Sequence, residues 1–480
     1  MLLSRAKYFI SYNFLIVFLS SLVFKAFPLH GDERPNFVVI LCDDLGYGDI
    51  SCYGNKIIKT PNIDRLASQG IRFTDYYSPS PVCSPSRIGL LTGRTPNRAG
   101  IYDWIPSGTQ FHLEEKEFTI PKMLKRVGYA TCMSGKWHCN GKFNKKSQPQ
   151  PGDFGFDHWF ATQNNAAPSH RNPKNFVRNG EGVGELEGFS CRIVAEEANR
   201  WIENHVIETP DQPFFTFIAF HEPHEPISSP ESMISNYPNA QKKGEALYYA
   251  NVENMDFAVG MIMDCLNRNK VAENTLVIFT SDNGPETLNR YGGAWRSHGS
   301  PGVLRGMKLH THEAGIRVPG VMRWPLQIKA GQVSDEPVNS LDLMPTFANL
   351  AAGEIPIDIQ LDGTDIVNAF GKDEVIRKRP MFWCYYSALN KSKVALRDGN
   401  WKLLASLKSK NDKYLKIRSL NKSNYDLVKT AKLVDFELYN IGNDNDESLN
   451  LVDKNHDEFK RLSEAMRMMF DEVLKDSKIW

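Results

Sequence analysis

Carboxylate and amide side chains stand at the ends of two expected strands. Asp43 and Asp44 follow an apolar run near the N-terminus, and Asp282 and Asn283 follow another run much later in the chain. Their hard oxygen atoms suit Ca²⁺ or Mg²⁺ rather than a thiolate-seeking metal. An isolated Asp after a strand would be explained by a turn or a helix cap. Converging carboxylates repel one another, so the four residues together predict a bound divalent cation.

Basic side chains follow other expected strands and loops, at Lys136, His138, His224 and Lys308. Such groups stabilise negative charge that develops on a transferred oxyanion, and they can protonate a leaving group. Each one alone is equally explained as a buried, hydrogen-bonded imidazole or as a surface charge. Together with the metal ligands they predict a pocket for an anionic substrate.

One cysteine differs from the others in its surroundings. The chain has eight cysteines, scattered without the spacing of a disulfide framework. Cys42 and Cys265 lie in apolar runs, where cysteine acts as a small buried hydrophobic residue. Cys83 lies instead among Ser, Pro and Arg in PVCSPSRIGLLTG, ahead of an expected buried helix that also carries Arg87 on the same face. Cys83 is therefore the candidate nucleophile.

Strand-like and helical segments alternate over most of the chain. Apolar strand patterns occupy 37–44, 129–137, 213–223 and 274–284, and helical patterns occupy 60–70, 119–128, 191–205 and 245–268. This alternation predicts an α/β fold with a large, mostly parallel sheet flanked by helices on both faces. Ligands bind at the carboxyl ends of the strands in such sheets, and the polar residues named above recur there.

The pattern changes from about residue 377 onward. Short antiparallel strands and a final amphipathic helix predict a smaller C-terminal α+β subdomain at 377–480. Between Lys391 and Lys432, twelve Lys and Arg residues stand against three Asp residues. This charge is explained either by a solvated basic face or by a site for a polyanionic glycan.

Residues 1–31 have the pattern of a secretory signal peptide. Arg5 and Lys7 precede an apolar stretch that is shorter than a comfortable membrane span and is followed by a polar boundary. An uncleaved signal-anchor is the alternative. In both cases the catalytic domain, expected at 32–376, is exported, so we expect a secreted or periplasmic protein without a stable membrane span in the mature chain. The net charge of +1 does not indicate a nucleic-acid partner.

The order of several motifs resembles the type I, formylglycine-dependent sulfatase family of the alkaline phosphatase superfamily. CSPSR followed by LTG is similar to its signature, and GKWH, PHEP, SDNG, LRGMKLHTHEAGIRVPG and LDLMPT follow in family order. Late in the chain, LRDGNWKLL and ELYNIGNDNDESLNL resemble its C-terminal subdomain. The resemblance implies an alkaline phosphatase-like fold and a sulfuric ester hydrolase. Ala314 departs from the family pattern, where Gly is usual, and we expect only a small backbone accommodation there.

The resemblance also implies a modified residue and a metal. A formylglycine-generating enzyme would oxidise Cys83 to formylglycine, whose hydrate attacks sulfur and later expels sulfate. One calcium ion would be bound by Asp43, Asp44, Asp282, Asn283 and the modified residue 83. Arg87 would hold the formylglycine hydroxyl, and Lys136 and Lys308 would bind sulfate oxygens. His138 would orient or assist elimination from the diol. His224 would protonate the departing alcohol.

Loop segments between the family motifs are candidates for substrate recognition. They are rich in aromatic, Asn, Arg and His residues, and the candidates are Trp104, His170, Arg171, Trp295, Arg296 and His298. The tryptophans are also explained by packing of the loops. An exported enzyme with such loops and a basic C-terminal region predicts a sulfated polysaccharide or oligosaccharide substrate. A phosphonate or phosphodiester hydrolase on the same scaffold and a non-catalytic protein that binds sulfated glycans are the alternatives.

Overall fold

The computed structural model describes residues 34–371 and 373–480. The expected signal peptide at residues 1–31 lies outside this range. Residues Arg34–Trp480 form one compact unit. Within the described residues, no helix combines the length and the apolar composition that crossing a membrane would require.

The centre of the fold is a parallel sheet. Strand β1 (Asn36–Asp43) lies between β8 (Phe214–Pro223) and β9 (Thr275–Ser281), and β8 pairs on its other side with β4 (Ala130–Lys136), all in parallel. β4 pairs in parallel with β5 (His158–Thr162). The expected mostly parallel sheet is therefore confirmed, and the carboxyl ends of these strands lie at one edge.

Short strands extend this sheet on both sides, so that among the described residues its order is β11-β2-β10-β9-β1-β8-β4-β5-β6-β7. β10 (Gly320–Arg323) is antiparallel to β9 and to β2 (Ile71–Phe73), and β11 (Gln332–Ser334) is parallel to β2. β6 (Val177–Arg178) and β7 (Glu181–Gly182) form the other, antiparallel edge. A separate parallel pair joins β3 (Tyr76–Tyr77) and β12 (Val338–Asn339). These short strands were not anticipated from the sequence.

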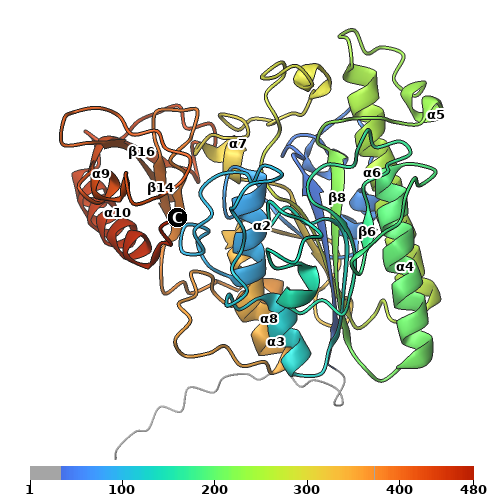
Figure 1. Cartoon of the computed structure of the whole chain (residues 1–480). Coiled ribbons are helices and arrows are strands. Elements are labelled where there is room, and N and C mark those ends of the chain that lie inside the picture. Colours follow the sequence, from blue (N-terminus) through green and yellow to red (C-terminus); the bar gives the residue numbers. More distant parts are fainter. Residues whose placement is uncertain (1–33, 372) are drawn as a thin grey trace, which may run out of the picture. The chain divides into compact units, whose positions relative to one another are not determined.

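Each face of the large sheet is covered by helices. Figure 1 shows α2 (Cys83–Thr92), α3 (Ile120–Arg126) and α8 (Leu343–Ala351) on the side opposite α4 (Ser190–Glu208) and α6 (Glu245–Arg268). α1 (Pro61–Ser68), which begins with Pro at its first position as a helix start favours, packs with α6 and contributes to the same core as α4. The short helices α5 (Glu231–Ile234) and α7 (Glu313–Ile316) lie in loops. The expected helices on both faces are confirmed.

Alternation along β1 explains why both faces are apolar. Phe37, Val39 and Leu41 belong to the core beneath α2, α3 and α8, whereas the intervening residues of the strand belong to the core beneath α1, α4 and α6. Successive side chains of a strand point to opposite faces of the sheet. A strand whose two faces are both covered is therefore a continuous run of apolar residues in the sequence. These two cores hold the strand ends, and the polar groups on them, in fixed positions.

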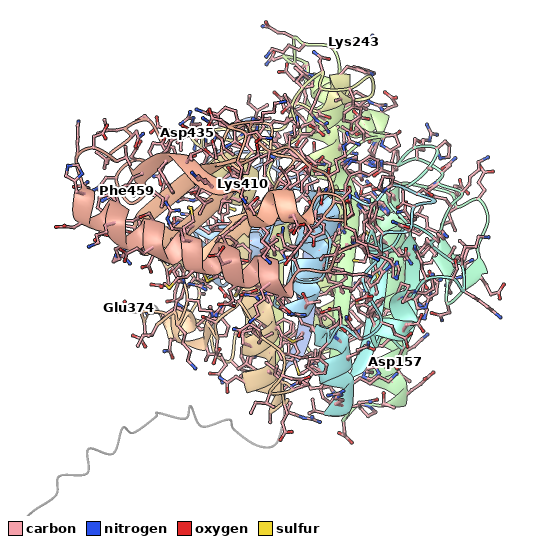
Figure 2. All side chains as sticks on the ribbon, turned by 60° about the vertical axis from the view of Figure 1, so that its left-hand side comes forward. Asp157, Lys243, Glu374, Lys410, Asp435 and Phe459 are labelled. Carbon is pink, nitrogen blue, oxygen red and sulfur yellow. The ribbon has the colours of Figure 1, made fainter. Side chains whose placement is uncertain are left out.

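The C-terminal part contains a four-stranded antiparallel sheet of β13 (Met381–Cys384), β14 (Val394–Asp398), β15 (Trp401–Lys408) and β16 (Lys432–Asn440). Between β15 and β16 lies α9 (Tyr425–Lys429). Helix α10 (His456–Asp476) packs on this sheet, and Figure 2 shows it with Phe459 labelled. The Phe459 ring meets that of Phe436 on β16 edge to face at 5.3 Å. The expected antiparallel strands and final helix are confirmed, and the domain boundary at residue 377 stays a prediction.

A fully buried lysine ties the C-terminal sheet to α7. Lys402 on β15 places its Nζ 2.8 Å from Oε1 of Glu313 and 2.9 Å from Oε1 of Glu447. On the neighbouring strand, Arg397 Nη2 lies 2.5 Å from Asp75 Oδ2. Breaking one partner of such a buried pair leaves an uncompensated charge, so these contacts hold the C-terminal sheet in one orientation.

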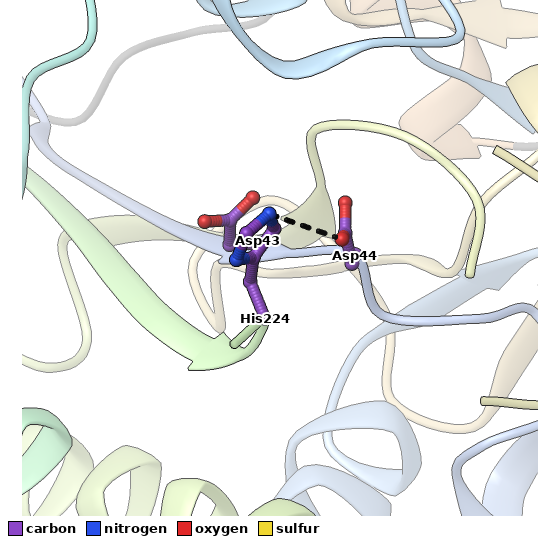
Figure 3. A group of neighbouring side chains, drawn as sticks. All are labelled: Asp43, Asp44 and His224. Carbon is purple, nitrogen blue, oxygen red and sulfur yellow. Dashed lines mark ion pairs between the residues drawn. The ribbon is translucent and has the colours of Figure 1, made fainter. Parts of the chain in front are cut away.

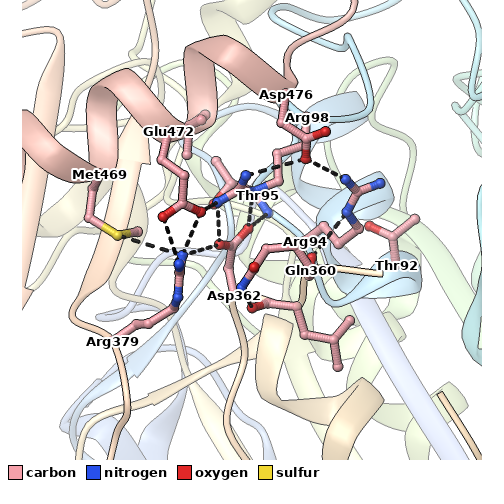
Figure 4. Close-up of polar contacts among 12 residues, drawn as sticks. Thr92, Arg94, Thr95, Arg98, Gln360, Asp362, Arg379, Met469, Glu472 and Asp476 are labelled. Atoms are coloured by element: carbon pink, nitrogen blue, oxygen red, sulfur yellow. Dashed lines mark hydrogen bonds and ion pairs between the residues drawn. The ribbon is translucent and has the colours of Figure 1, made fainter. Parts of the chain in front are cut away.

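A second ionic network joins α10 to the loop that follows α2 (Figure 4). Arg98 Nε donates to Oδ2 of Asp362 at 2.8 Å, and its Nη2 donates to Oε1 of Glu472 on α10 at 2.7 Å. Arg94 Nη2 donates to Oδ2 of Asp476 at 2.6 Å. The terminal helix is thereby attached to the segment that immediately follows the helix beginning at Cys83.

Candidate active site

Two carboxylates stand where β1 ends. Asp43 is the last residue of the strand and Asp44 follows it, and both are buried. Asp44 has φ of 65°, in the left-handed region that Asp tolerates better than most residues. The chain therefore turns sharply at this point and presents two consecutive carboxylates at the sheet edge.

The end of β9 brings two further ligand candidates to the same place. Asp282 Oδ1 accepts from the backbone N–H of Asp44 at 3.3 Å, and Asn283 Nδ2 donates to Asp44 Oδ1 at 2.7 Å. The following Gly284 has no room for a side chain, because a Cβ there would lie 1.7 Å from the carbonyl oxygen of Ala314. The four residues that the sequence suggested as metal ligands are thus adjacent in space.

Three cations surround these carboxylates. Lys136, the last residue of β4, places Nζ 2.5 Å from Asp43 Oδ2, and Lys308 places Nζ 2.6 Å from Asp44 Oδ1. Arg87 on α2 donates through Nε to Asp282 Oδ2 at 2.9 Å and through Nη1 to the carbonyl oxygen of Lys136 at 3.0 Å. Burial alone would raise the pKa of Asp43, but Lys136 and the other cations outweigh it and hold that pKa well below its usual range.

The donor set fits a divalent cation. Asp43 Oδ1 and Asn283 Oδ1 are buried and make no hydrogen bond within the part of the chain that the structure describes. Burial raises the pKa of Asp44 to about 6 and, with the nearby charge of Asp43, raises the pKa of Asp282 to about 7. The carboxylates still repel one another although three basic side chains lie beside them, and a bound cation would relieve this repulsion. Unpartnered hard oxygens and crowded carboxylates are the features of a Ca²⁺ or Mg²⁺ site.

His224 lies beside this cluster, one residue after β8. Its Nδ1 donates to the carbonyl oxygen of Glu225 at 2.7 Å, and its Nε2 lies 3.6 Å from Asp44 Oδ2. Figure 3 shows the imidazole beside both Asp43 and Asp44, and one ligand atom from each of the three residues lies within 4.8 Å of the others. Burial lowers the pKa of His224 to about 3. The ring is therefore neutral in this structure, with its Nε2 free of a proton.

Cys83 begins helix α2 next to these groups. Its side chain is 3% exposed and packs against Val82, Leu309 and Tyr385. Burial raises the pKa of the Cys83 thiol to about 11, with Lys136 and Lys308 opposing the effect and Asp43 and Asp282 adding to it. A neutral, buried thiol is a poor nucleophile, so the unmodified residue is unsuited to attack an ester.

His138 lies two residues beyond β4 and also reaches the pocket. Its Nε2 donates to the carbonyl oxygen of Ile105 at 3.2 Å, and its Nδ1 makes no hydrogen bond among the described residues. Burial and the charge of Lys136 lower the pKa of His138 well below its usual range. A neutral imidazole with a free nitrogen can accept a proton.

The active-site pocket has a volume of about 660 Å³. Its lining includes Cys83, His138, His224 and Lys308, so the nucleophile candidate and three proton donors or acceptors face one space. Arg87 and Lys136 are fully buried and do not belong to this lining. Arg87 contacts Asp282 and Lys136 contacts Asp43, and the expected contact of Lys136 with sulfate oxygens stays a prediction.

Of the six expected substrate-binding residues, the structure places one in the lining of the active-site pocket. Trp104 is 41% exposed and lines the pocket, whereas His170, Arg171, Trp295, Arg296 and His298 lie outside its lining. His170 is fully buried, with Nδ1 3.5 Å from Glu222 Oε1. Arg296 pairs with Glu225 and donates to the carbonyl oxygen of Ile227 at 3.0 Å. Arg171 is exposed, Trp295 lies under Lys243, and His298 donates to the carbonyl oxygen of Lys243 at 2.9 Å.

Other pocket residues were not among the candidates from the sequence. They are Asp103, Asn164, Asn165, Arg290, Tyr291, Tyr385, Ser387, Leu389, Lys416 and Arg418. The three loop segments singled out from the sequence, at 98–108, 162–176 and 289–300, contain five of them: Asp103, Asn164, Asn165, Arg290 and Tyr291. Apart from Trp104, the residues chosen within those segments lie outside the lining. Lys416 and Arg418 belong to the basic region of the C-terminal part, and its charge was the signal that could have identified them.

Ala314 needs no unusual backbone. It lies in α7 and does not have a positive φ, so its backbone conformation is one that alanine adopts without strain. The next residue, Gly315, is the position without room, because a Cβ there would lie 2.0 Å from the carbonyl oxygen of His310. The motif around Lys308 therefore keeps its local geometry.

Comparison with known proteins agrees with this geometry. The sulfatase family matches residues 35–354, and the family described as N-sulphoglucosamine sulphohydrolase, C-terminal, matches residues 307–476. Human arylsulfatase A is 35% identical over 392 residues, covering 77% of this chain and 74% of that protein. N-acetylgalactosamine-6-sulfatase of Rattus norvegicus is 34% identical over 376 residues, covering 73% of this chain and 68% of that protein.

Solved structures share the fold over nearly the whole chain. Ps i-CgsB in complex with k-i-k-neocarrahexaose superimposes with a TM-score of 0.76 at 28% identity, covering 93% of this chain and 94% of that chain. PsFucS1 sulfatase from Pseudoalteromonas sp. gives a TM-score of 0.74 at 24% identity, covering 93% and 92%. Family matches, relatives and fold all agree with the pocket: the chain belongs to the sulfatase family and is an enzyme that hydrolyses sulfate esters.

Proposed function

We propose that this enzyme removes sulfate groups from a sulfated carbohydrate, with Cys83 converted to formylglycine and one calcium ion held by Asp43, Asp44, Asp282 and Asn283. The observation that carries the proposal is the pocket that Cys83 lines together with Lys308 and His224, two residues that also lie next to Asp44 of the carboxylate cluster. The buried thiol is a poor nucleophile, and the unpartnered oxygens of the cluster fit a divalent ion.

The walls of the pocket support a carbohydrate substrate. Trp104 and Tyr291 offer partly exposed aromatic faces, and Asn164 and Asn165 offer amides that can bond hydroxyl groups. The relatives named above include a sulfatase of an aminosugar and a protein solved with a bound oligosaccharide. A sugar ring would therefore meet both stacking surfaces and hydrogen-bonding groups.

Positive charge at the mouth of the pocket supports an anionic substrate. Lys416 and Arg418 are exposed residues that reach the lining from the segment between β15 and α9. Arg290 also lines the pocket, but it makes two hydrogen bonds with Glu286, at 2.7 and 2.6 Å, so its charge is largely compensated. Cations at the mouth of a pocket raise the local concentration of an anionic ligand.

The basic residues of the site have different roles in the proposed reaction. The formylglycine hydrate would supply the nucleophile, and a calcium ion held by Asp43, Asp44, Asp282 and Asn283 would supply positive charge. Lys308 lines the pocket and can donate to a sulfate oxygen, which stabilises charge that develops during transfer. Arg87 and Lys136 fix Asp282 and Asp43 in place through the contacts described above. His138, with Nδ1 free, is placed to accept a proton.

His224 is the group we assign to protonation of the departing alcohol. The contact of Nδ1 with the Glu225 carbonyl directs Nε2 toward the pocket. A bound sulfate ester adds negative charge beside the ring and raises its pKa from the low value of the ligand-free site. The proton would then be held on Nε2, where an ester oxygen can receive it.

Replacement of His224 by alanine tests this assignment. We expect a loss of about 10²-fold or more in kcat/KM on a sugar sulfate, and a smaller loss on 4-nitrophenyl sulfate, because nitrophenolate leaves without protonation. His456→Ala, at the exposed start of α10, serves as the matched control and should behave as wild type. Equal losses on both esters together with weaker calcium binding would instead make His224 a metal ligand, as its place beside Asp43 and Asp44 permits.

A substrate panel tests the function itself. Sulfate release is measured from oligosaccharides of carrageenan and of chondroitin sulfate, and from 4-nitrophenyl sulfate and 4-nitrophenyl phosphate, with Cys83→Ala as the background. We expect at least one carbohydrate to be desulfated with a higher kcat/KM than the aryl sulfate, and the phosphate to react much more slowly. Turnover of the aryl sulfate alone would reject the carbohydrate substrate. Hydrolysis of the phosphate faster than of the sulfates would favour the alternative that the enzyme is a phosphonate or phosphodiester hydrolase.

A further inference from the structure

The active-site pocket adjoins a second pocket of similar size. Asn164 and Asn165 line both, so the two spaces meet at this pair of residues. The second pocket has a volume of about 660 Å³, the same as that of the active-site pocket. We call it the Lys142 arm, and the residues used below are Gln163, Asn164, Asn165, Lys142, Phe143 and Lys145.

One wall of the Lys142 arm is fixed by a buried glutamine. Gln148 Oε1 accepts from the backbone N–H of Gly141 at 3.0 Å and of Lys142 at 2.7 Å. Its Nε2 donates to the carbonyl oxygens of Thr109 at 3.0 Å and Gln110 at 2.9 Å. The side-chain amide thus joins two loops into one surface. A wall that is already ordered costs little conformational entropy when a ligand binds.

The wall shared with the active site contains two side-chain amides whose oxygens have no hydrogen-bond partner among the described residues. The backbone carbonyl of Asn164 accepts from Thr162 Oγ1 at 2.7 Å, and that of Asn165 accepts from Asn175 Nδ2 at 2.8 Å. These bonds hold the main chain, whereas the two Asn side chains make no hydrogen bond within the described range of residues. Gln163 is held by its Nε2, which donates to the carbonyl oxygen of Asn140 at 2.9 Å. Ordered backbone with free amides is suited to hydroxyl groups of a ligand.

The rim of the arm is basic and its floor is partly aromatic. Lys142 and Lys145 are exposed, and neither pairs with a carboxylate in residues 34–371 or 373–480. Phe143 lies between them in sequence, and its ring meets that of Trp159 edge to face at 5.7 Å, which fixes its position. Two uncompensated cations over an amide and aromatic surface favour an anionic, hydroxyl-rich ligand.

We propose that the Lys142 arm binds the sugar that neighbours the one losing its sulfate, and that Lys142 and Lys145 contact an anionic group on that neighbour. This inference rests on the proposed carbohydrate function. Its substrate is accordingly an oligosaccharide with at least two sugars and a second negative charge. A sulfated monosaccharide would fill the active-site pocket and leave the arm empty.

A length series with matched variants tests the arm. The substrates are a sulfated monosaccharide and the di- and tetrasaccharide from the polymer that reacts fastest in the panel described above. The enzymes are wild type, the double variant Lys142→Ala/Lys145→Ala, and Lys146→Ala as a control, because Lys146 is an exposed neighbour outside the lining. Binding is measured separately by calorimetry with the tetrasaccharide on Cys83→Ala forms of the same proteins, at low and high salt.

For wild type we expect kcat/KM to rise from the monosaccharide to the longer substrates. The double variant should lose roughly tenfold in kcat/KM on the tetrasaccharide through KM, and its binding should depend less on salt. Its rate on the monosaccharide should match wild type, and Lys146→Ala should match wild type throughout. Length-independent rates, or a double variant that equals the control, would overturn the inference while leaving the carbohydrate function intact. Failure to desulfate any carbohydrate at any length would instead overturn both.

Discussion

Replacing Cys83 by alanine is expected to abolish sulfate ester hydrolysis while the protein remains folded. Loss of a catalytic nucleophile lowers turnover by at least about 10⁴-fold in enzymes where it has been removed, and alanine at residue 83 has no thiol whose oxidation could convert Cβ into an aldehyde. The side chain belongs to a small apolar cluster that includes Val82 and Leu309, so the variant should lose about 1 kcal/mol of unfolding free energy. Initial rates on 4-nitrophenyl sulfate and thermal unfolding check the two expectations.

A second buried cysteine supplies the control for this experiment. Cys265 lies in α6 within the core on one face of the sheet and outside the lining of the active-site pocket. Cys265→Ala should cost similar stability and keep its activity. Turnover in the Cys83→Ala protein near that of Cys265→Ala would show that residue 83 is not the nucleophile, whatever the stability of the two variants.

Removal of calcium is expected to abolish activity and to destabilise the enzyme. Asp43, Asp44 and Asp282 are buried within one cluster, so loss of a divalent ion leaves their mutual repulsion less compensated. At a calcium concentration 100 times Kd, binding contributes about 2.7 kcal/mol to the free energy of unfolding. Chelation should therefore lower the unfolding temperature and the activity together, and added Ca²⁺ should restore both.

Two variants make the metal experiment specific to the cluster. Asp43→Asn should weaken calcium binding and remove most of the stabilisation that calcium gives. Asp412→Asn, which changes an exposed carboxylate that pairs with Lys408, should respond to calcium as wild type does. Full activity and an unchanged unfolding temperature after complete chelation would contradict the assignment of a metal to this cluster.

The sequence alone predicted the framework of the active site because that framework depends on local patterns. A strand covered on both faces must be apolar throughout, and the break in that pattern marks where β1, β4 and β9 end. Asp43, Lys136 and Asp282 stand at those breaks, and parallel strands bring their carboxyl ends to one edge. Their proximity thus followed from the fold class without any knowledge of side-chain contacts.

The walls of the pocket depended on packing that no local pattern encodes. Lys416 and Arg418 reach the lining because buried pairs such as Lys402 with Glu313 orient the C-terminal sheet. Residue type alone does not determine which loop side chains line the pocket: Arg296 pairs with Glu225 and lies outside the lining. His170, also chosen by its residue type, is fully buried.

Mass spectrometry of the tryptic peptide containing residue 83, isolated from enzyme of measured specific activity, tests the central claim most directly. We expect residue 83 to have lost its sulfur and gained an aldehyde oxygen, in a fraction of molecules that rises in proportion to specific activity across preparations. An intact Cys83 thiol throughout a fully active preparation would contradict the account.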